Sequence, residues 1–252
     1  MRHFKYVKVV MERTELKLKY DICEAAQSGI PVIVVAAGAS SRMQGTNKQL
    51  ALVGGIPVLI RTLSVFESSK DISNIILVVR DEDLFEIQML CSKYMISKVS
   101  DIVCGGKTRQ ESVLKGFARL KGSDKTVLIH DGARPFVDAK IINSVKSALE
   151  SCNAVTCGVK VKDTIKEIDE SGKVIKTLPR ENLISVQTPQ GVTVAEYLKA
   201  TQNVDVSRFT DDMSVMEAAG YAVTVVEGSY KNIKITTKED IIMAEGLLSG
   251  EE

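Results

Sequence analysis

Short apolar runs alternate with amphipathic helical segments from residue 31 onward, and this alternation restricts the possible folds more than any other feature. The runs are rich in β-branched residues, which is typical of strands buried on both faces of a parallel sheet. We expect strands at residues 32–36, 75–79, 98–103 and 126–130. We expect helices at residues 57–66, 83–94, 109–120 and 138–151. The pattern predicts an α/β fold with a doubly wound, mainly parallel, Rossmann-like sheet.

The alternation is interrupted after residue 159 by a segment with the period of a β-hairpin. Residues 164–178 alternate apolar and polar side chains on either side of a turn at Glu170, Ser171 and Gly172. A lone hairpin has little of its own to bury its apolar face against. We therefore predict an arm, about residues 160–182, that packs on a second copy of the chain in a homodimer. The remaining expected elements are strands at 183–187, 222–227 and 232–235 and helices at 193–202, at 212–219 and from Thr237.

The composition argues against several classes of partner. The 252 residues carry a formal net charge of +1, which does not suit a nucleic-acid or membrane surface. No apolar run approaches the roughly 18 residues of a membrane-spanning helix. The five cysteines form no C-x-x-C pair, so we expect reduced thiols in a cytoplasmic protein. We expect residues 1–28 to be an extension of unknown role that precedes one domain at residues 29–252.

The connection after the first expected strand combines small residues with cations. Ala36, Ala37 and Gly38 leave backbone N–H groups accessible to an anion. Arg42 and Lys48 add a planar fork and a mobile charge, which together suit a triphosphate. The G-x-G-x-x-G and G-x-x-x-x-G-K-[ST] patterns are both absent. The loop alone therefore leaves an ordinary strand-to-helix connection equally open.

A second loop with two glycines, residues 105–112, is expected at the same edge, because doubly wound sheets bind ligands at the carboxyl ends of their strands. Gly106 leaves a free N–H group, and Arg109 and Ser112 lie on the first turn of the following helix. These groups suit a base edge or a phosphate. A plain turn is equally consistent with the pattern.

The third loop of this edge follows Asp131, which ends an apolar strand. A carboxylate there is costly unless it meets a cation or a metal. We predict that Asp131 binds the Mg²⁺ that arrives with a nucleotide, and a helix cap or an ion pair with Arg134 is the alternative. We interpret His130 as a structural histidine rather than a base. Lys234 interrupts an apolar run, and taken alone it favours the solvent face of an edge strand.

Seven motifs occur in an order that resembles one known family. They are AAGASSRM at 36–43 followed by Lys48, GGxxRxxS at 105–112, HDGARPF at 130–136, KDTIK at 162–166, TPQ at 188–190, TDD at 210–212 and NIKIT at 232–236. From about residue 31 to 248 the chain resembles the 2-C-methyl-D-erythritol 4-phosphate cytidylyltransferases. The resemblance implies a fold of the nucleotide-diphospho-sugar transferase type. It also implies transfer of CMP from CTP to methylerythritol phosphate, with Mg²⁺ and release of diphosphate, in non-mevalonate isoprenoid synthesis.

The same resemblance implies a role for individual residues. Catalysis would depend on four cations, namely Arg42, Lys48, Lys234 and Arg180. The CTP site would comprise Ala36, Ala37, Gly38, Gly106, Arg109, Ser112 and Asp131, with Asp131 as the metal ligand. The methylerythritol phosphate site would comprise Arg134, Thr164, Arg180, Thr188, Thr210 and Lys234. Thr164 and Arg180 would reach the partner subunit's site on the arm.

Two other activities remain as alternatives to this interpretation. A ribitol 5-phosphate cytidylyltransferase has a similar frame, but such chains tend to differ at the positions of Ala37 and Gly132. A nucleotide-binding protein without catalysis is possible on the same fold, although intact cations argue against it. Two departures from the family pattern concern the first loop: Ser40 replaces a frequent glycine, and the segment 42–48 is about one residue short.

Overall fold

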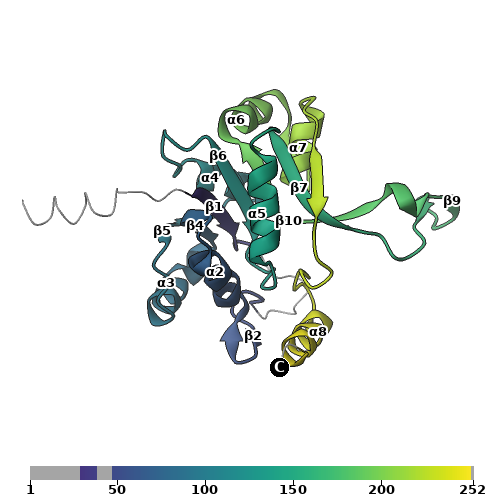
Figure 1. Cartoon of the computed structure of the whole chain (residues 1–252). Coiled ribbons are helices and arrows are strands. Elements are labelled where there is room, and N and C mark those ends of the chain that lie inside the picture. The colour runs from purple at the N-terminus through teal and green to yellow at the C-terminus, as the bar shows by residue number, and fades with distance from the viewer. Residues whose placement is uncertain (1–28, 39–46, 251–252) are drawn as a thin grey trace, which may run out of the picture.

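The computed structural model describes residues 29–38 and 47–250 of the chain. Its centre is a sheet of seven strands in the order β11-β7-β10-β6-β1-β4-β5 (Figure 1). The strands of this sheet are β1 (Ile30–Val35), β4 (Ile72–Val79), β5 (Val99–Cys104), β6 (Thr126–Asp131), β7 (Ala154–Lys160), β10 (Ile184–Thr193) and β11 (Thr224–Glu227). β10 runs antiparallel to β6 and β7, whereas the other neighbouring strands pair in parallel. The predicted doubly wound, mainly parallel α/β sheet is confirmed.

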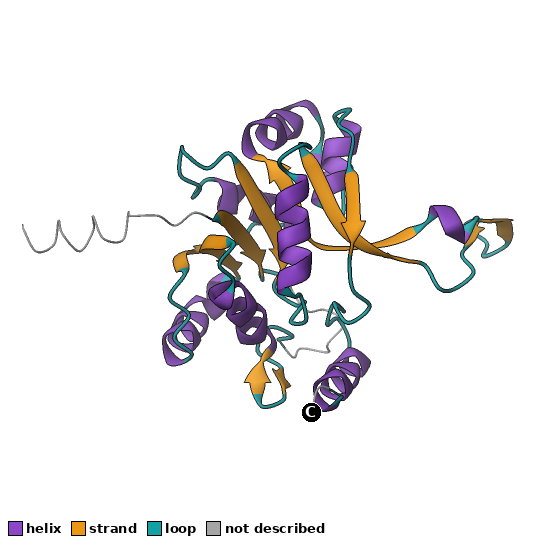
Figure 2. Cartoon of the chain, viewed as in Figure 1, coloured by secondary structure: helices purple, strands orange, loops and turns teal. Residues whose placement is uncertain are grey.

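Helices cover both faces of the sheet (Figure 2). The α-helices of the described ranges are α2 (Val58–Ser68), α3 (Leu84–Lys93), α4 (Arg109–Phe117), α5 (Ala139–Ala148), α6 (Val194–Asn203), α7 (Asp212–Ala218) and α8 (Lys238–Ser249). Short 3-10 turns lie at η2 (Asp81–Asp83), η3 (Arg180–Asn182) and η4 (Val206–Arg208). No helix within residues 29–38 and 47–250 has the length and apolarity that crossing a membrane requires.

The two faces of β1 show how the alternating side chains divide the core. Val32 and Val34 pack with α2 and α5 in one apolar cluster, while Ile33 packs with α4, α6 and α7 in the other. All three β1 side chains are fully buried. A strand covered on both faces has a continuous apolar sequence, and this is the reason that the run at 32–36 identified it. The carboxyl end of β1 is thereby fixed beside those of β4 and β6.

Side-chain caps fix where several helices begin near that edge. The side chains of Thr108, Asp138 and Asp211 accept hydrogen bonds from N–H groups in the first turns of α4, α5 and α7. Thr237 and Asp240 form a capping box at the start of α8, and the sequence predicted that this helix begins at Thr237. These caps satisfy N–H groups that have no partner within the helix.

The arm projects from the body of the molecule, well away from the central sheet (Figure 1). It consists of β8 (Lys166–Ile168) paired antiparallel with β9 (Val174–Thr177), which confirms the predicted hairpin. Gly172 in its turn has a φ of 82°, a conformation that favours glycine. A smaller hairpin of β2 (Leu52–Val53) and β3 (Ile56–Pro57) lies beside α8, as the hydrogen bond from Gly54 N to Glu245 Oε1 shows.

The predicted strand at 232–235 is wrong, because this segment joins no sheet. Its backbone bonds to the loop after β6 instead: Ile235 N donates to Ala133 O, and Arg134 Nη1 donates to Asn232 O. The alternating pattern arises because Asn232 and Ile235 are buried by that loop. The predicted strand at 183–187 is the beginning of β10, which continues to Thr193.

Candidate active site

Two cavities meet at the carboxyl edge of the sheet and share Arg109, Asp131 and Lys234. The first, which we call the glycine cavity, has a volume of about 300 Å³. Its lining includes Ala37, Gly38, Lys48, Gly106, Ser112 and Gln49. The second, which we call the β10 cavity, has a volume of about 560 Å³. Its lining includes Arg134, Thr188, Gln190, Thr210, Met213 and Glu217.

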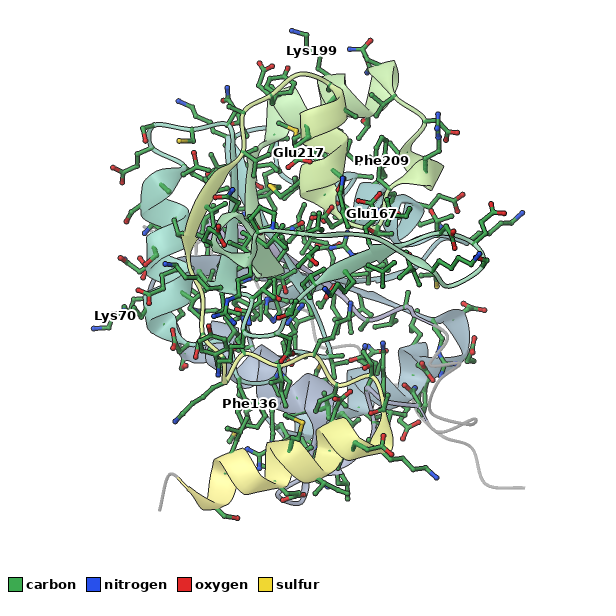
Figure 3. All side chains as sticks on the ribbon, turned by 90° about the vertical axis from the view of Figure 1, so that its right-hand side faces the viewer. Lys70, Phe136, Glu167, Lys199, Phe209 and Glu217 are labelled. Carbon is green, nitrogen blue, oxygen red and sulfur yellow. The ribbon has the colours of Figure 1, made fainter. Side chains whose placement is uncertain are left out.

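Figure 3 shows the molecule from the side of the arm, with Glu217 of α7 above the sheet and Phe136 below it near α8. Glu217 is one of the residues that line the β10 cavity. The three shared residues come from different elements. Arg109 begins α4, Asp131 ends β6, and Lys234 follows β11.

Asp131 is surrounded by three cations. Lys234 Nζ lies 2.7 Å from its Oδ2, Arg109 Nε lies 3.5 Å from its Oδ1, and Arg134 Nε lies 3.6 Å from its Oδ2. Burial alone raises the pKa of this carboxyl, but the charges of Arg109, Lys234 and Arg134 together hold it well below the ordinary value. Asp131 is therefore ionised. The ion pair between Asp131 and Arg134, which the sequence left as an alternative, is present. It is one of the three ion pairs that Asp131 makes.

Arg109 is itself held by a buried carboxylate. Its Nη1 lies 2.7 Å from Oδ2 of Asp212, whose side chain is fully buried. Tyr197 donates its hydroxyl to Oδ1 of Asp212 at 2.7 Å. Burial lowers the pKa of Arg109, but Asp212 and Asp131 outweigh this effect and raise it. The guanidinium therefore stays charged and fixed between the two cavities.

The sequence analysis gave Asp212 no role in the site. The TDD motif contained the signal, because one carboxylate suffices to cap a helix and a second one, Asp212, follows the cap as the first residue of α7. Asp211 is the cap of α7, since its side chain accepts from Ser214 N at 3.1 Å. Asp212 is thus left to pair with Arg109. The pairing partner lies on α4, and no local pattern identifies it.

The loop 105–112 is built for close backbone approach. A Cβ on Gly106 would lie 2.3 Å from Cβ of Glu111, so no larger residue fits without a shift. Gly106 N donates to Oγ of Ser112 at 3.0 Å, and this hydroxyl donates to Thr108 O at 2.9 Å. The glycine and the serine therefore shape the wall of the cavity together. The prediction of a free N–H group at Gly106 is wrong, because the Ser112 hydroxyl folds back over the loop and accepts this hydrogen bond.

The other predicted residues are placed as follows. The prediction of an accessible N–H group at Ala36 is wrong, because Ala36 is buried and its N–H donates to Val78 O as a continuation of the sheet. Ala37 and Gly38 do line the glycine cavity. Thr210 lines the β10 cavity, and Thr188 lines it with a nearly buried side chain. Arg42 lies outside the described residues.

The two predicted arm residues line neither cavity of their own subunit. Thr164 is exposed at the base of the arm, and Arg180 is exposed at the start of η3. Arg180 Nη1 donates to Lys162 O at 3.0 Å. Within one subunit the structure thus brings Lys48, Asp131, Arg134 and Lys234 together but leaves Thr164 and Arg180 apart.

Asp131 itself is a donor of the kind that Mg²⁺ prefers, and the groups around it are three cations. Among the described residues, no group of three or more His, Cys, Asp or Glu side chains could hold a metal by itself. Mg²⁺ in nucleotide sites is bound by one or two carboxylates, with phosphate oxygens and water as the other ligands. The single ionised carboxylate of Asp131, on the wall shared by both cavities, satisfies that requirement.

Comparisons with known proteins identify the family. The model of the 2-C-methyl-D-erythritol 4-phosphate cytidylyltransferase family matches residues 30–250. The cytidylyltransferase of that name from Halalkalibacterium halodurans is 45% identical over 224 residues, which cover 88% of this chain and 97% of the relative. The one from Clostridium novyi is 47% identical over 220 residues, which cover 86% and 95%.

Solved structures agree with the sequence relatives. The 4-diphosphocytidyl-2C-methyl-D-erythritol synthase from Anaerococcus prevotii superimposes with a TM-score of 0.78 at 35% identity, covering 88% of this chain and 97% of that one. The 2-C-methyl-D-erythritol 4-phosphate cytidylyltransferase from Thermus thermophilus gives a TM-score of 0.70 at 28% identity, covering 88% and 99%. The chain belongs to the 2-C-methyl-D-erythritol 4-phosphate cytidylyltransferase family.

Proposed function

We propose that this chain transfers CMP from CTP to 2-C-methyl-D-erythritol 4-phosphate, giving 4-diphosphocytidyl-2-C-methyl-D-erythritol and diphosphate in non-mevalonate isoprenoid synthesis. Family membership over residues 30–250 supports the reaction. The observation that carries the proposal is the pair of cavities that share Arg109, Asp131 and Lys234. Two substrates bound on either side of this cluster meet at charged groups.

The reaction needs positioning and positive charge rather than a general base. A phosphate monoester has its second pKa near 6, so the acceptor is already an oxyanion at neutral pH. One of its oxygens forms a bond to the α-phosphorus of CTP, and the bond to the bridging oxygen of the β-phosphate breaks. Diphosphate leaves with that electron pair. Lys48 and Lys234 face the glycine cavity, where they stabilise the charge that develops.

Each cavity takes one substrate in this proposal. CTP occupies the glycine cavity, with its base against Gly106 and Ser112 and its phosphates against Ala37, Gly38 and Lys48. Arg42 belongs to the same cation set by resemblance. Asp131 holds Mg²⁺, which neutralises phosphate charge. The acceptor occupies the β10 cavity beside Arg134 and Thr210, which line it.

We propose that the functional unit is a homodimer formed through the arms. The arm exposes apolar side chains, because Ile168, Val174 and Ile175 are all more than half exposed. Arg180 and Thr164 line neither the glycine cavity nor the β10 cavity of their own subunit, which supports their action in the site of a second copy. The four cysteines of the described residues are free, which suits the cytoplasm.

The test is diphosphate release by purified protein with CTP and Mg²⁺. Methylerythritol 4-phosphate and ribitol 5-phosphate are supplied as acceptors in separate reactions. We expect release with methylerythritol phosphate alone. Lys48→Ala should abolish it, and Lys140→Ala, which removes an exposed lysine of α5 that lines neither cavity, serves as the matched control. Release with ribitol phosphate alone would reassign the acceptor. No release with either would contradict the enzymatic function.

A further inference from the structure

His130 lies directly beneath the site, fully buried at the end of β6. Its ring contacts Phe66 edge-on, with centroids 4.9 Å apart. Its two nitrogens face two polar groups of the site. Nε2 lies 3.2 Å from the backbone oxygen of Arg134, and Nδ1 lies 3.0 Å from Oγ1 of Thr188.

The backbone oxygen of Arg134 fixes the position of the ring proton. A carbonyl oxygen can only accept a hydrogen bond, so Nε2 must carry the proton. The ring is fully buried, and its two nitrogens face a carbonyl oxygen and a hydroxyl group rather than a carboxylate, so this environment favours the neutral form. In a neutral ring with a proton on Nε2, Nδ1 has a bare lone pair.

The Thr188 hydroxyl must therefore donate to Nδ1 of His130. The same oxygen accepts a hydrogen bond from Asp131 N at 3.1 Å. The side-chain amide of Asn232 donates to the backbone oxygen of Thr188 at 2.9 Å, and Arg134 donates to the backbone oxygen of Asn232. These bonds connect the end of β6, β10 and the segment before Lys234 into one buried network.

We propose that His130 is a positioning residue, which as the Nε2–H tautomer turns the Thr188 hydroxyl into an acceptor for the backbone of Asp131. The single proton of that hydroxyl is used within the protein. Thr188 thus cannot donate to a phosphate oxygen of the acceptor substrate. Its contribution to the reaction is to hold Asp131, and the acceptor phosphate must be bound by other groups, such as Arg134.

The tautomer can be measured without any substrate. The chain contains two histidines, His3 and His130. We would label histidine with ¹⁵N in the full-length protein and record long-range ¹H–¹⁵N correlations at neutral pH, with His3→Gln to assign the signals. The expected pattern for His130 is Nε2–H with a hydrogen-bonded Nδ1, and Thr188→Val should shift the Nδ1 signal. A proton on Nδ1, in either a neutral or a charged ring, would overturn the inference.

The kinetic test rests on the proposed function. It distinguishes a Thr188 that holds Asp131 in place from a Thr188 that binds the acceptor phosphate. Thr188→Val should lower kcat by about tenfold or more, because the Asp131 amide loses its acceptor, while KM for the acceptor stays within about twofold. Thr188→Ser keeps a hydroxyl and should recover kcat relative to Thr188→Val. A rise in KM for the acceptor, or an unchanged kcat in Thr188→Val, would overturn the positioning role.

The two experiments distinguish this inference from the proposed reaction. If the wild-type protein releases no diphosphate with any acceptor while His130 gives the Nε2–H pattern, the reaction is wrong and the hydrogen-bond network stands. If the protein is active and His130 carries its proton on Nδ1, the reaction stands and the network is wrong.

Discussion

At the scale of single residues, the site depends on buried ion pairs. Arg109 contacts Asp131 on one side and Asp212 on the other. Both carboxylates are buried, so each needs its cation to offset the cost of losing water. Removing one member leaves an uncompensated charge, and the effect on stability should exceed that of any exposed pair in the molecule.

Asp212→Asn tests that coupling. We expect a loss of about 3 kcal/mol in the free energy of unfolding, because the Arg109 charge remains buried with one partner fewer. Urea denaturation followed by circular dichroism measures it. The matched control is Glu167→Gln, which removes an exposed carboxylate 2.9 Å from Lys176 on the arm and should cost less than about 1 kcal/mol. Equal losses in the two variants would contradict the buried pairing.

Gly106→Ala tests the close packing of the loop 105–112. The new methyl group would lie 2.3 Å from the Glu111 side chain, so the loop must shift and the wall of the glycine cavity with it. We expect the affinity for CTP to fall by about tenfold or more. Titration calorimetry with CTP and Mg²⁺ measures this affinity. Gly122→Ala meets no atom within 4 Å and should bind CTP like the wild type; a similar loss in both variants would refute the steric argument.

At the scale of elements, caps and turns decide where the chain changes direction around the site. The capping box of Thr237 and Asp240 starts α8 three residues after Lys234. Asp240 Oδ2 accepts from Thr236 N and Thr237 N at 2.7 Å and 2.8 Å. Burial raises the pKa of Asp240, but these hydrogen bonds from Thr236 and Thr237 lower it below the ordinary value.

The pH dependence of this cap has a definite sign. A carboxyl whose pKa is depressed in the folded state stabilises the protein above its unfolded pKa, near 3.9 for Asp, and this stabilisation disappears as the pH falls through the folded value. Asp240→Asn should cost about 1 kcal/mol at pH 7. The difference from wild type should shrink below about pH 4. Thermal unfolding at pH 7 and at acid pH measures it, and a constant difference would exclude the charged cap.

The elements that the sequence predicted are those whose signal is local. Buried strands such as β1 are continuous apolar runs, and the hairpin of the arm alternates around Gly172. The prediction of a strand at 232–235 was wrong. An alternating pattern indicates that every second residue is buried, and in this segment a loop rather than a sheet buries those residues. Asp131 was found because a carboxylate at the end of an apolar strand is unusual, whereas the partners of Asp131 are distant in sequence.

At the scale of the whole molecule, the arm is the feature that a single subunit does not explain. Its apolar side chains are exposed, and its cation Arg180 lines neither cavity of its own chain. A two-fold dimer in which each arm reaches the other subunit would bury these side chains and complete both sites. Stability and activity should then depend on protein concentration together.

Subunit mixing tests this arrangement. Arg180→Ala and Lys48→Ala should each be inactive alone. In a mixed dimer, one site combines an intact Lys48 with an intact Arg180 from the partner's arm, so random exchange should restore about a quarter of the wild-type activity. Diphosphate release after mixing measures it, with sedimentation to verify the dimers. No recovery in verified mixed dimers would show that Arg180 acts in its own subunit, and an Arg180→Ala variant that is active alone would show that Arg180 is not required.

Local sequence patterns were sufficient to predict the alternation of strands and helices, the hairpin and the edge of the sheet at which the two cavities lie. These features follow from neighbouring residues, whose burial and hydrogen bonds repeat with the period of a strand or a helix. Only the three-dimensional structure showed that Arg109 lies between Asp131 and Asp212, that Thr188 is hydrogen-bonded to both His130 and the Asp131 backbone, and that segment 232–235 binds a loop. Such pairings join residues far apart in the chain, because the low dielectric of the interior makes each buried charge or donor require a partner wherever the fold provides one.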